Sequence, residues 1–311
     1  MMYRADRVGE ADREAFVAYC LEHRFDHDES FLSERDLAGI VFDSDEVAFA
    51  LRSAEGGTRI LGAAALMITP AFREVGKARF RIIHVEPSVG AADEADAYRV
   101  LVEAVLPFAK ALSFAYLFLP ERARRVADII LGLGFRVERY SWLLERSLDQ
   151  VEPTSFPEGY SLERIDPSEP EASSLWCGIV NLAFERLAGH TRMTSERLLA
   201  DRDAGLEFPG SYLILRDAGG IAVGLALTVK DVDDAQGKSA LLGPIAVLPT
   251  LQGRGLGRSL LRAGMMAARD AGFSSCVLTV NSENNDAAEL YLSEGFTRKD
   301  VYVCYRRDLV G

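Results

Sequence analysis

The sequence contains little cysteine, little histidine and fewer basic than acidic residues. Its 311 residues include four cysteines and four histidines. Cysteines that lie far apart without a CxxC pair predict free thiols in a reducing compartment, and so few dispersed histidines give no reason to expect a metal site. Lysine and arginine number 35 against 47 acidic residues, for a net charge of -12. This charge argues against a nucleic acid as the main partner, because binding a phosphate backbone needs a basic face.

Long apolar runs are also absent from the sequence. No stretch reaches the roughly 18 consecutive apolar residues that a membrane helix needs. The chain begins Met-Met-Tyr-Arg-Ala-Asp, and no apolar run follows the basic residue. A signal peptide is therefore not expected. Together these absences predict a soluble, cytoplasmic protein.

Two segments of the chain echo each other. Gly134-Phe135 and Gly295-Phe296 each open a stretch that ends in a strand-like run, and residues 83–87 resemble residues 245–249. The landmarks recur in the same order at nearly the same spacing, which predicts two copies of one fold.

The stretch between the two copies has the composition of a linker. Residues 149–159 contain two prolines, a glycine and polar residues without apolar periodicity. We therefore predict a first domain over residues 1–151 and a second over residues 152–311.

The second domain is expected to combine strands and helices in the order β-α-α-β-β-β-α-β-α-β. This order predicts a mixed α/β (α+β) fold, with a mostly antiparallel sheet flanked by helices in each domain. The expected strands cover residues 160–165, 211–216, 221–230, 239–247, 275–280 and 298–306, and the expected helices cover residues 171–185, 194–202, 257–271 and 285–294.

A glycine-rich loop joins an expected strand to an expected helix. It consists of Gln252, Gly253, Arg254, Gly255, Leu256, Gly257 and Arg258. The start of a helix offers unpaired N–H groups, glycines let the main chain approach an anion, and the two arginines add positive charge. The loop is thus a candidate diphosphate site, although the same glycines are also compatible with a simple tight turn.

A second motif follows the loop and strengthens the diphosphate hypothesis. Residues 252–257 resemble the Q/R-x-x-G-x-G/A loop of the GNAT superfamily of N-acetyltransferases. Residues 284–296 are similar to the superfamily segment N-x-x-A-x-x-L-Y-x-x-x-G-F. The order of the expected elements in the second half also resembles the GNAT fold, and tandem GNAT proteins exist.

The resemblance implies an acetyl-CoA site in the second domain. By likeness to the family, the backbone of Ile245, Ala246 and Val247 would contact the pantetheine arm, and the loop 252–258 would hold the pyrophosphate. Asn284 matches an asparagine that often contacts the cofactor, although it is also placed to cap a helix. Tyr291 matches the tyrosine that often protonates the departing thiolate, and a phenol with a pKa near 10 is protonated at pH 7.

The general base is not identified by the sequence. Many relatives place a glutamate on the strand before the loop, but residues 239–245 contain no carboxylate. The candidates that remain are a chain of water molecules or one of the following side chains: Glu185, His190, Glu207, Asp231 and Asp233.

The first domain lacks both pieces of this chemistry. Where the loop should lie, residues 88–96 carry Asp93, Glu94 and Asp96, which would repel a diphosphate. Ile130 stands where the second half has Tyr291. We therefore expect a degenerate, non-catalytic first domain. Arg79 and Arg81 would either hold an acidic group of the substrate or pack as exposed arginines.

Two functional hypotheses follow from the resemblance. The first is an acyl-CoA-dependent N-acetyltransferase that moves the acetyl group from acetyl-CoA to a primary amine, on a small molecule or a peptide, by direct attack. The alternative is a non-catalytic acyl-CoA sensor or scaffold. Under either, we expect no metal, no nucleic acid and no membrane partner, and a monomer in which the two domains form an internal pseudo-dimer.

Overall fold

The computed structural model describes residues 2–23, 42–187, 191–202, 205–232, 234 and 236–309. The chain forms two compact units. Unit 1 comprises residues 1–142, 281–283 and 300–311, and unit 2 comprises residues 143–280 and 284–299. The sequence predicted two domains, over residues 1–151 and 152–311. This division into independently folding domains stays a prediction.

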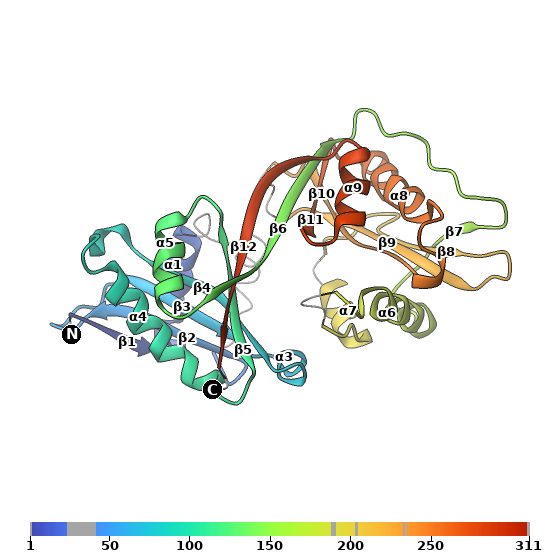
Figure 1. Ribbon diagram of the computed structural model, residues 1–311. Coiled ribbons are helices and arrows are strands. Elements are labelled where there is room, and N and C mark those ends of the chain that lie inside the picture. The colour runs from blue at the N-terminus through green and yellow to red at the C-terminus, as the bar shows by residue number, and fades with distance from the viewer. Residues whose placement is uncertain are drawn as a thin grey trace. The chain divides into compact units, whose positions relative to one another are not determined.

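Unit 1 contains a mixed sheet with helices on both faces (Figure 1). The pairs β1–β2, β2–β3, β3–β4 and β5–β12 are antiparallel, and β4 pairs with β5 in parallel. In spatial order its strands are β1 (Tyr3–Arg7), β2 (Glu46–Ser53), β3 (Gly62–Met67), β4 (Lys77–Val85), β5 (Phe114–Pro120), β12 (Thr297–Asp308) and β6 (Arg136–Ser147). The helices and 3-10 turns are η1 (Glu10–Asp12), α1 (Arg13–Glu22), α3 (Pro70–Glu74), η4 (Pro87–Val89), α4 (Glu94–Val105), η5 (Leu106–Ala109) and α5 (Arg124–Gly132).

The faces of this sheet follow from the alternation of side chains along β2. Val47, Phe49 and Leu51 pack in the same cluster as the buried face of α4. Ala48 and Ala50 point to the other face, where small side chains leave room for α1. Successive residues of a strand point to opposite sides, so one run of apolar residues supplies two cores.

Unit 2 repeats this arrangement. Its sheet is antiparallel except for the pairing of β10 with β11. In spatial order its strands are β6, β11 (Ser275–Asn281), β10 (Ser239–Val247), β9 (Ala222–Lys230), β8 (Tyr212–Arg216) and β7 (Ser161–Arg164). The helices are α6 (Pro170–Phe184), α7 (Ser195–Arg202), α8 (Leu256–Asp270) and α9 (Asn285–Ser293), with the 3-10 turn η6 (Pro249–Leu251).

Strand β8 shows why unit 2 carries helices on both sheet faces. Tyr212 and Ile214 pack with α6, whereas Leu213 and Leu215 pack with α8. All ten elements predicted for the second half are present, each within a few residues of its expected bounds. The predictions of a mixed α/β fold and of a tandem repeat are confirmed.

Two strands pass from one unit to the other. Strand β12 starts in unit 2, but its residues from Asp300 onward belong to unit 1. There β12 pairs with β5 in antiparallel register, from Tyr302 opposite Pro120 to Asp308 opposite Phe114. Strand β6 starts in unit 1, and its residues from Leu143 onward belong to unit 2. The last strand of the second repeat therefore completes the sheet of the first.

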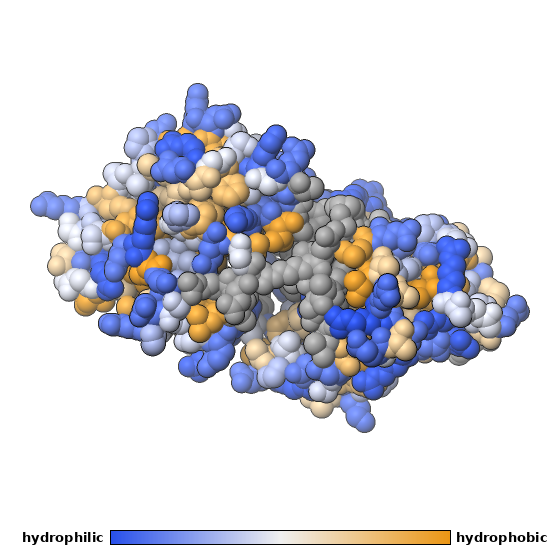
Figure 2. Space-filling model, turned by 180° about the vertical axis from the view of Figure 1, so that it is seen from behind, coloured by the Kyte–Doolittle hydropathy of each residue, from blue (hydrophilic) through white to orange (hydrophobic). Residues whose placement is uncertain are grey.

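Large apolar side chains are exposed in both units. The face seen in Figure 2 shows hydrophobic residues in small separate groups among hydrophilic ones. Ile221 and Leu182 are the most exposed large apolar residues described, at 63% and 57%. Within the described residues, no helix is long and apolar enough to cross a membrane.

Candidate acyl-CoA site

A single pocket in unit 2 collects most of the residues that the two motifs singled out. Its volume is about 830 Å³, and its walls come from the end of α6, the end of β10, the glycine loop, α8 and α9. Eleven of the twelve predicted site residues line it: Ile245, Ala246, Val247, Gln252, Gly253, Gly255, Leu256, Gly257, Arg258, Asn284 and Tyr291. The twelfth, Arg254, is exposed on the loop and is not part of the lining.

The pocket forms where strands β10 and β11 separate and stop pairing. Their parallel pairing covers only residues 239–241 of β10. Beyond it, the register of β10 against β9 shifts between Leu242 and Ile245. Two residues of the sequence explain the shift. Pro244 has no N–H to give to a strand partner, and a Cβ on Gly243 would come within 2.9 Å of Leu227 Cδ2.

Beyond this register shift, β10 still pairs with β9. Residues 245–247 pair with β9, from Ile245 opposite Ala226 to Val247 opposite Gly224. The register with β11 has ended by then, so in the described structure the other edge of these residues borders the pocket. An unpaired strand edge presents backbone N–H and C=O groups to whatever lies beside it.

The glycine loop adopts a conformation that only glycine tolerates well. Gly253 and Gly255 have φ angles of 76° and 79°, in the left-handed region. A Cβ added at either glycine would meet nothing within 4 Å. The space beside both glycines is therefore open to a ligand.

Helix α8 begins at this loop without a capping side chain. Its N-cap is Gly255, and no side chain accepts a hydrogen bond from its first turn. That first turn also contains no acidic residue. Unpaired N–H groups and the positive end of the helix dipole make such a terminus an anion-binding site.

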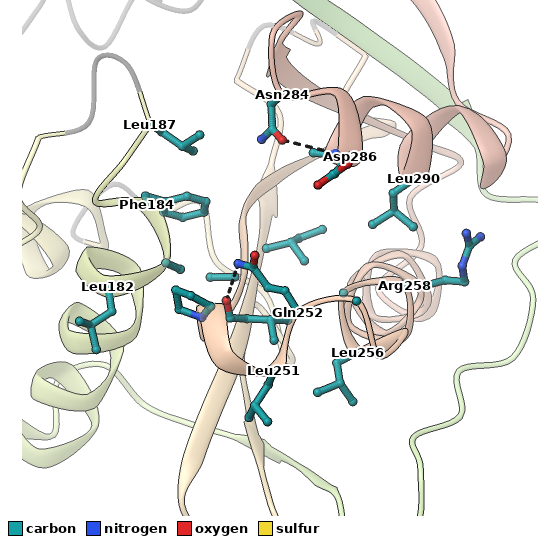
Figure 3. A pocket seen from close by; sticks show the side chains of 18 of the residues that line it. Leu182, Phe184, Leu187, Leu251, Gln252, Leu256, Arg258, Asn284, Asp286 and Leu290 are labelled. Carbon is teal, nitrogen blue, oxygen red and sulfur yellow. Dashed lines mark hydrogen bonds between the residues drawn. The ribbon is translucent and has the colours of Figure 1, made fainter.

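The polar side chains of the loop are used in different ways. Gln252 Nε2 donates a hydrogen bond of 3.0 Å to the carbonyl oxygen of Val247, so this side chain braces the loop against β10. The side chain of Arg258 points away from the centre of the pocket in Figure 3, and its guanidinium group donates to Glu294. Within the described residues Arg254 makes no ion pair and stays in solvent.

Helix α9 supplies the opposite wall. Asn284 caps it by accepting a hydrogen bond of 3.4 Å from the N–H of Ala287 (Figure 3). Tyr291 lies in the last turn, with its ring 6.0 Å from that of Phe296 in an edge-to-face arrangement. Burial raises the pKa of the Tyr291 hydroxyl to about 12, so this group stays protonated at neutral pH.

The candidates for a general base are distributed unevenly around this pocket. Glu185 lines it, just after the end of α6. Glu207 lines a different cavity, and Asp231 lines neither. His190 and Asp233 lie outside the described residues.

Sequence reasoning missed part of the wall. Asp286, in the first turn of α9, also lines the pocket. Leu182, Phe184 and Leu187 form an apolar side across from it, as Figure 3 shows. The apolar spacing of α6 predicted the helix, but no local signal shows which of its residues meet a loop about 70 positions later.

The equivalent region of unit 1 carries different side chains. Its parallel pairing is equally short and covers residues 77–79 of β4. Val89 and Ile130 belong to the core cluster there, and the first turn of α4 carries Glu94 and Asp96. The first turn of α4 is therefore acidic, whereas the first turn of α8 is not.

The arginines of β4 are not the exposed side chains that one alternative assumed. Arg79 is only 8% exposed and lies over the ring of Phe118 at 4.9 Å. Arg81 forms a two-bond ion pair with Glu46, at 2.6 and 3.1 Å, and its side chain is 13% exposed. The prediction that Arg79 and Arg81 pack as exposed arginines is therefore wrong about their exposure. Arg79 is held against an aromatic ring, and Arg81 is held by the carboxylate of Glu46.

The second half of the chain is similar to known acetyltransferases. Residues 176–296 match the Acetyltransferase (GNAT) family, which confirms the predicted resemblance to the GNAT superfamily. The chain is similar to the mycothiol acetyltransferase of Pseudarthrobacter chlorophenolicus, with 29% identity over 58% of this chain and 56% of the relative. It is also similar to the mycothiol acetyltransferase of Thermobispora bispora, with 33% identity over 61% of this chain and 63% of the relative. The alignments thus span less than two thirds of these relatives.

A solved structure shows the same fold over the whole chain. A tandem GNAT protein from the clavulanic acid biosynthesis pathway superimposes with a TM-score of 0.74. The match covers 99% of both chains at 16% sequence identity. This likeness supports the tandem fold alone.

Proposed function

We propose that this protein is an acyl-CoA-dependent N-acetyltransferase, with its donor site in unit 2. One observation carries the proposal: the uncapped start of α8, two left-handed glycines and the unpaired edge of β10 all border one pocket. That combination suits an extended ligand with a diphosphate at one end and an amide-bearing arm at the other.

The residues present fit acetyl-CoA. The N–H groups of the loop and of the first turn of α8 would hold the diphosphate, and the open space beside Gly253 and Gly255 leaves room for it. The backbone of residues 245–247 would align the pantetheine arm, as an added strand pairs with a sheet edge. When bound, acetyl-CoA supplies a thioester carbonyl as the electrophile.

Tyr291 is our proposed general acid. Its hydroxyl lies at the pocket, and burial keeps it protonated by raising its pKa to about 12. A thiol with a pKa of about 8.5 leaves as a thiolate, and a positioned phenol can give it a proton.

The acceptor amine must lose a proton before it attacks the carbonyl directly. At pH 7 this costs about 4–5 kcal/mol for an alkyl ammonium group with a pKa of about 10.4. Among the described carboxylates, Glu185 and Asp286 are the ones that line the pocket. Both are exposed, so each can act on the amine directly or through water.

The acceptor is proposed as a primary amine of a small molecule or a peptide. The names of the two relatives add an amine related to mycothiol to the compounds worth testing. The alternative function, an acyl-CoA sensor without turnover, draws support from the absence of a carboxylate on β10.

A turnover assay separates the two functions. Free thiol released from acetyl-CoA is measured over a panel of amines, and acetyl-CoA binding is measured by calorimetry on the same protein. Binding with amine-dependent thiol release supports the enzyme. Binding without release for any amine supports the sensor, and no binding rules out both.

A further inference from the structure

A buried carboxylate at the end of α9 is bonded by side chains of α8. The side chain of Glu294 is only 2% exposed. It follows α9 and precedes Gly295, whose φ of 85° turns the chain back into β12. The family motif allows any residue at the position of Glu294, so it assigns no role to this side chain.

Three arginines surround this carboxylate. Arg262 binds it through two hydrogen bonds, from Nε to Oε2 at 2.7 Å and from a terminal nitrogen to Oε1 at 2.9 Å. Arg258 donates to Oε1 as well, and Arg146 lies 3.9 Å from Oε2. A two-bond pair fixes orientation as well as distance, because both groups are planar.

Glu294 is ionised in this setting. Burial raises its pKa, but the hydrogen bonds and charges of Arg262 and Arg258 outweigh burial, and its pKa is lowered overall. A buried charge that loses its partners is costly, so the four side chains hold one another in place.

The network joins two elements that the proposed reaction needs. Arg258 is the third residue of α8, whose first turn borders the diphosphate position. Glu294 donates its own N–H to the carbonyl oxygen of Tyr291 at 3.1 Å. A Cβ on Gly257 would lie 3.8 Å from Leu290 Cδ2, so the two helices touch at this level.

We propose that Glu294 is a positioning residue for acyl transfer. It ties the first turn of α8 to the last turn of α9, and so sets the distance between the groups that hold the diphosphate and the hydroxyl of Tyr291. This inference rests on the proposed function. A shift of about 1 Å between such groups can cost up to 100-fold in rate.

The test compares Glu294→Gln with a matched control in unit 1. Glu46 forms a similar two-bond pair with Arg81, and its side chain is 11% exposed. Glu46→Gln therefore removes a comparable buried charge far from the glycine loop in sequence and in the other unit. For both variants we would measure thermal stability, kcat for thiol release and the Kd of acetyl-CoA.

We expect both variants to lose stability, and only Glu294→Gln to lose function. Its kcat should fall about 10- to 100-fold and its Kd for acetyl-CoA should rise. In a Tyr291→Phe background the same substitution should lower kcat much less, because residues that act as a unit are not additive. Full additivity would show that Glu294 does not act through Tyr291, and would overturn the inference.

A second variant protects the test against misfolding. Arg262→Lys keeps the positive charge and removes the two-bond geometry, so it should lower kcat in the same direction. Suppose that the wild type is active and that the folded Glu294→Gln or Arg262→Lys variant keeps a normal kcat and Kd. This result would overturn the inference about Glu294 and leave the proposed function intact. A wild type that neither binds acetyl-CoA nor releases thiol overturns the proposed function and this inference together.

Discussion

Replacing Gly255 with alanine tests the diphosphate site directly. Gly255 is the N-cap of α8 and has a φ of 79°. Alanine in the left-handed region costs about 1–2 kcal/mol. In a unit of about 150 residues, this corresponds to a fall in Tm of roughly 2–8 °C. The methyl group itself would meet no protein atom within 4 Å, so it should not disturb the fold otherwise.

The same methyl group should interfere with the ligand. It would stand where a diphosphate approaches the amides of Leu256 and Gly257. Hydrogen bonds to a charged group contribute about 1.5–3 kcal/mol each. Losing one of them raises the Kd of acetyl-CoA roughly 10- to 150-fold.

Gly272 provides a matched control at the other end of α8. Its φ is 96°, an added Cβ would again meet nothing within 4 Å, and it does not line the pocket. Gly272→Ala should therefore lower Tm by a similar amount and leave the affinity for acetyl-CoA unchanged. Calorimetric titration and a thermal melt of both variants give the comparison. Equal affinities in the two variants would refute the assignment of the loop to the diphosphate.

Four further predictions concern the reaction and the protein in solution. Tyr291→Phe should lower kcat about 10²- to 10⁴-fold and leave the Kd of acetyl-CoA nearly unchanged. Because the pKa of Tyr291 is raised to about 12, ionisation of this hydroxyl should not lower the wild-type kcat below about pH 11, whereas an ordinary phenol is half-ionised at about pH 10. Titration with acetyl-CoA should give a stoichiometry near one per chain, since the loop of unit 2 has a left-handed glycine pair, whereas residues 88–96 of unit 1 contain a single left-handed glycine, Gly90; two equivalent sites would contradict this. Light scattering should show a monomer, and a tight dimer at low micromolar concentration would count against it.

Local sequence patterns were enough to predict the elements of unit 2. The helix expected over residues 257–271 was placed by Leu260, Leu261, Gly264, Met265 and Ala268, and all five are buried on α8. The spacing of apolar residues within each such element shows whether it is a helix or a strand and which of its faces is buried. The glycine loop was also predictable from the sequence, because a backbone position with a positive φ favours glycine.

Features that depend on distant partners were not predictable in the same way. Glu294 meets Arg258 from 36 positions away, and a glutamate beside a glycine carries no sign of that contact. The pairing of β12 with β5 joins residues that lie 182 to 194 positions apart. An apolar strand pattern shows that a strand will be buried, but it does not show which of several similar edges it will join.

The two units illustrate how one helix terminus can serve stability or binding. Helix α4 carries Glu94 and Asp96 in its first turn, and acids there stabilise a helix through its dipole by about 0.3–1 kcal/mol each. Helix α8 has neither an acid nor a capping side chain in its first turn. Unit 2 therefore forgoes this stabilisation and leaves its N–H groups free for an outside anion. In unit 1 the helix start is already neutralised, and the buried side chains of Val89 and Ile130 belong to the core. The difference in charge at the two helix starts, more than any difference in fold, is our physical reason for placing the donor site in unit 2.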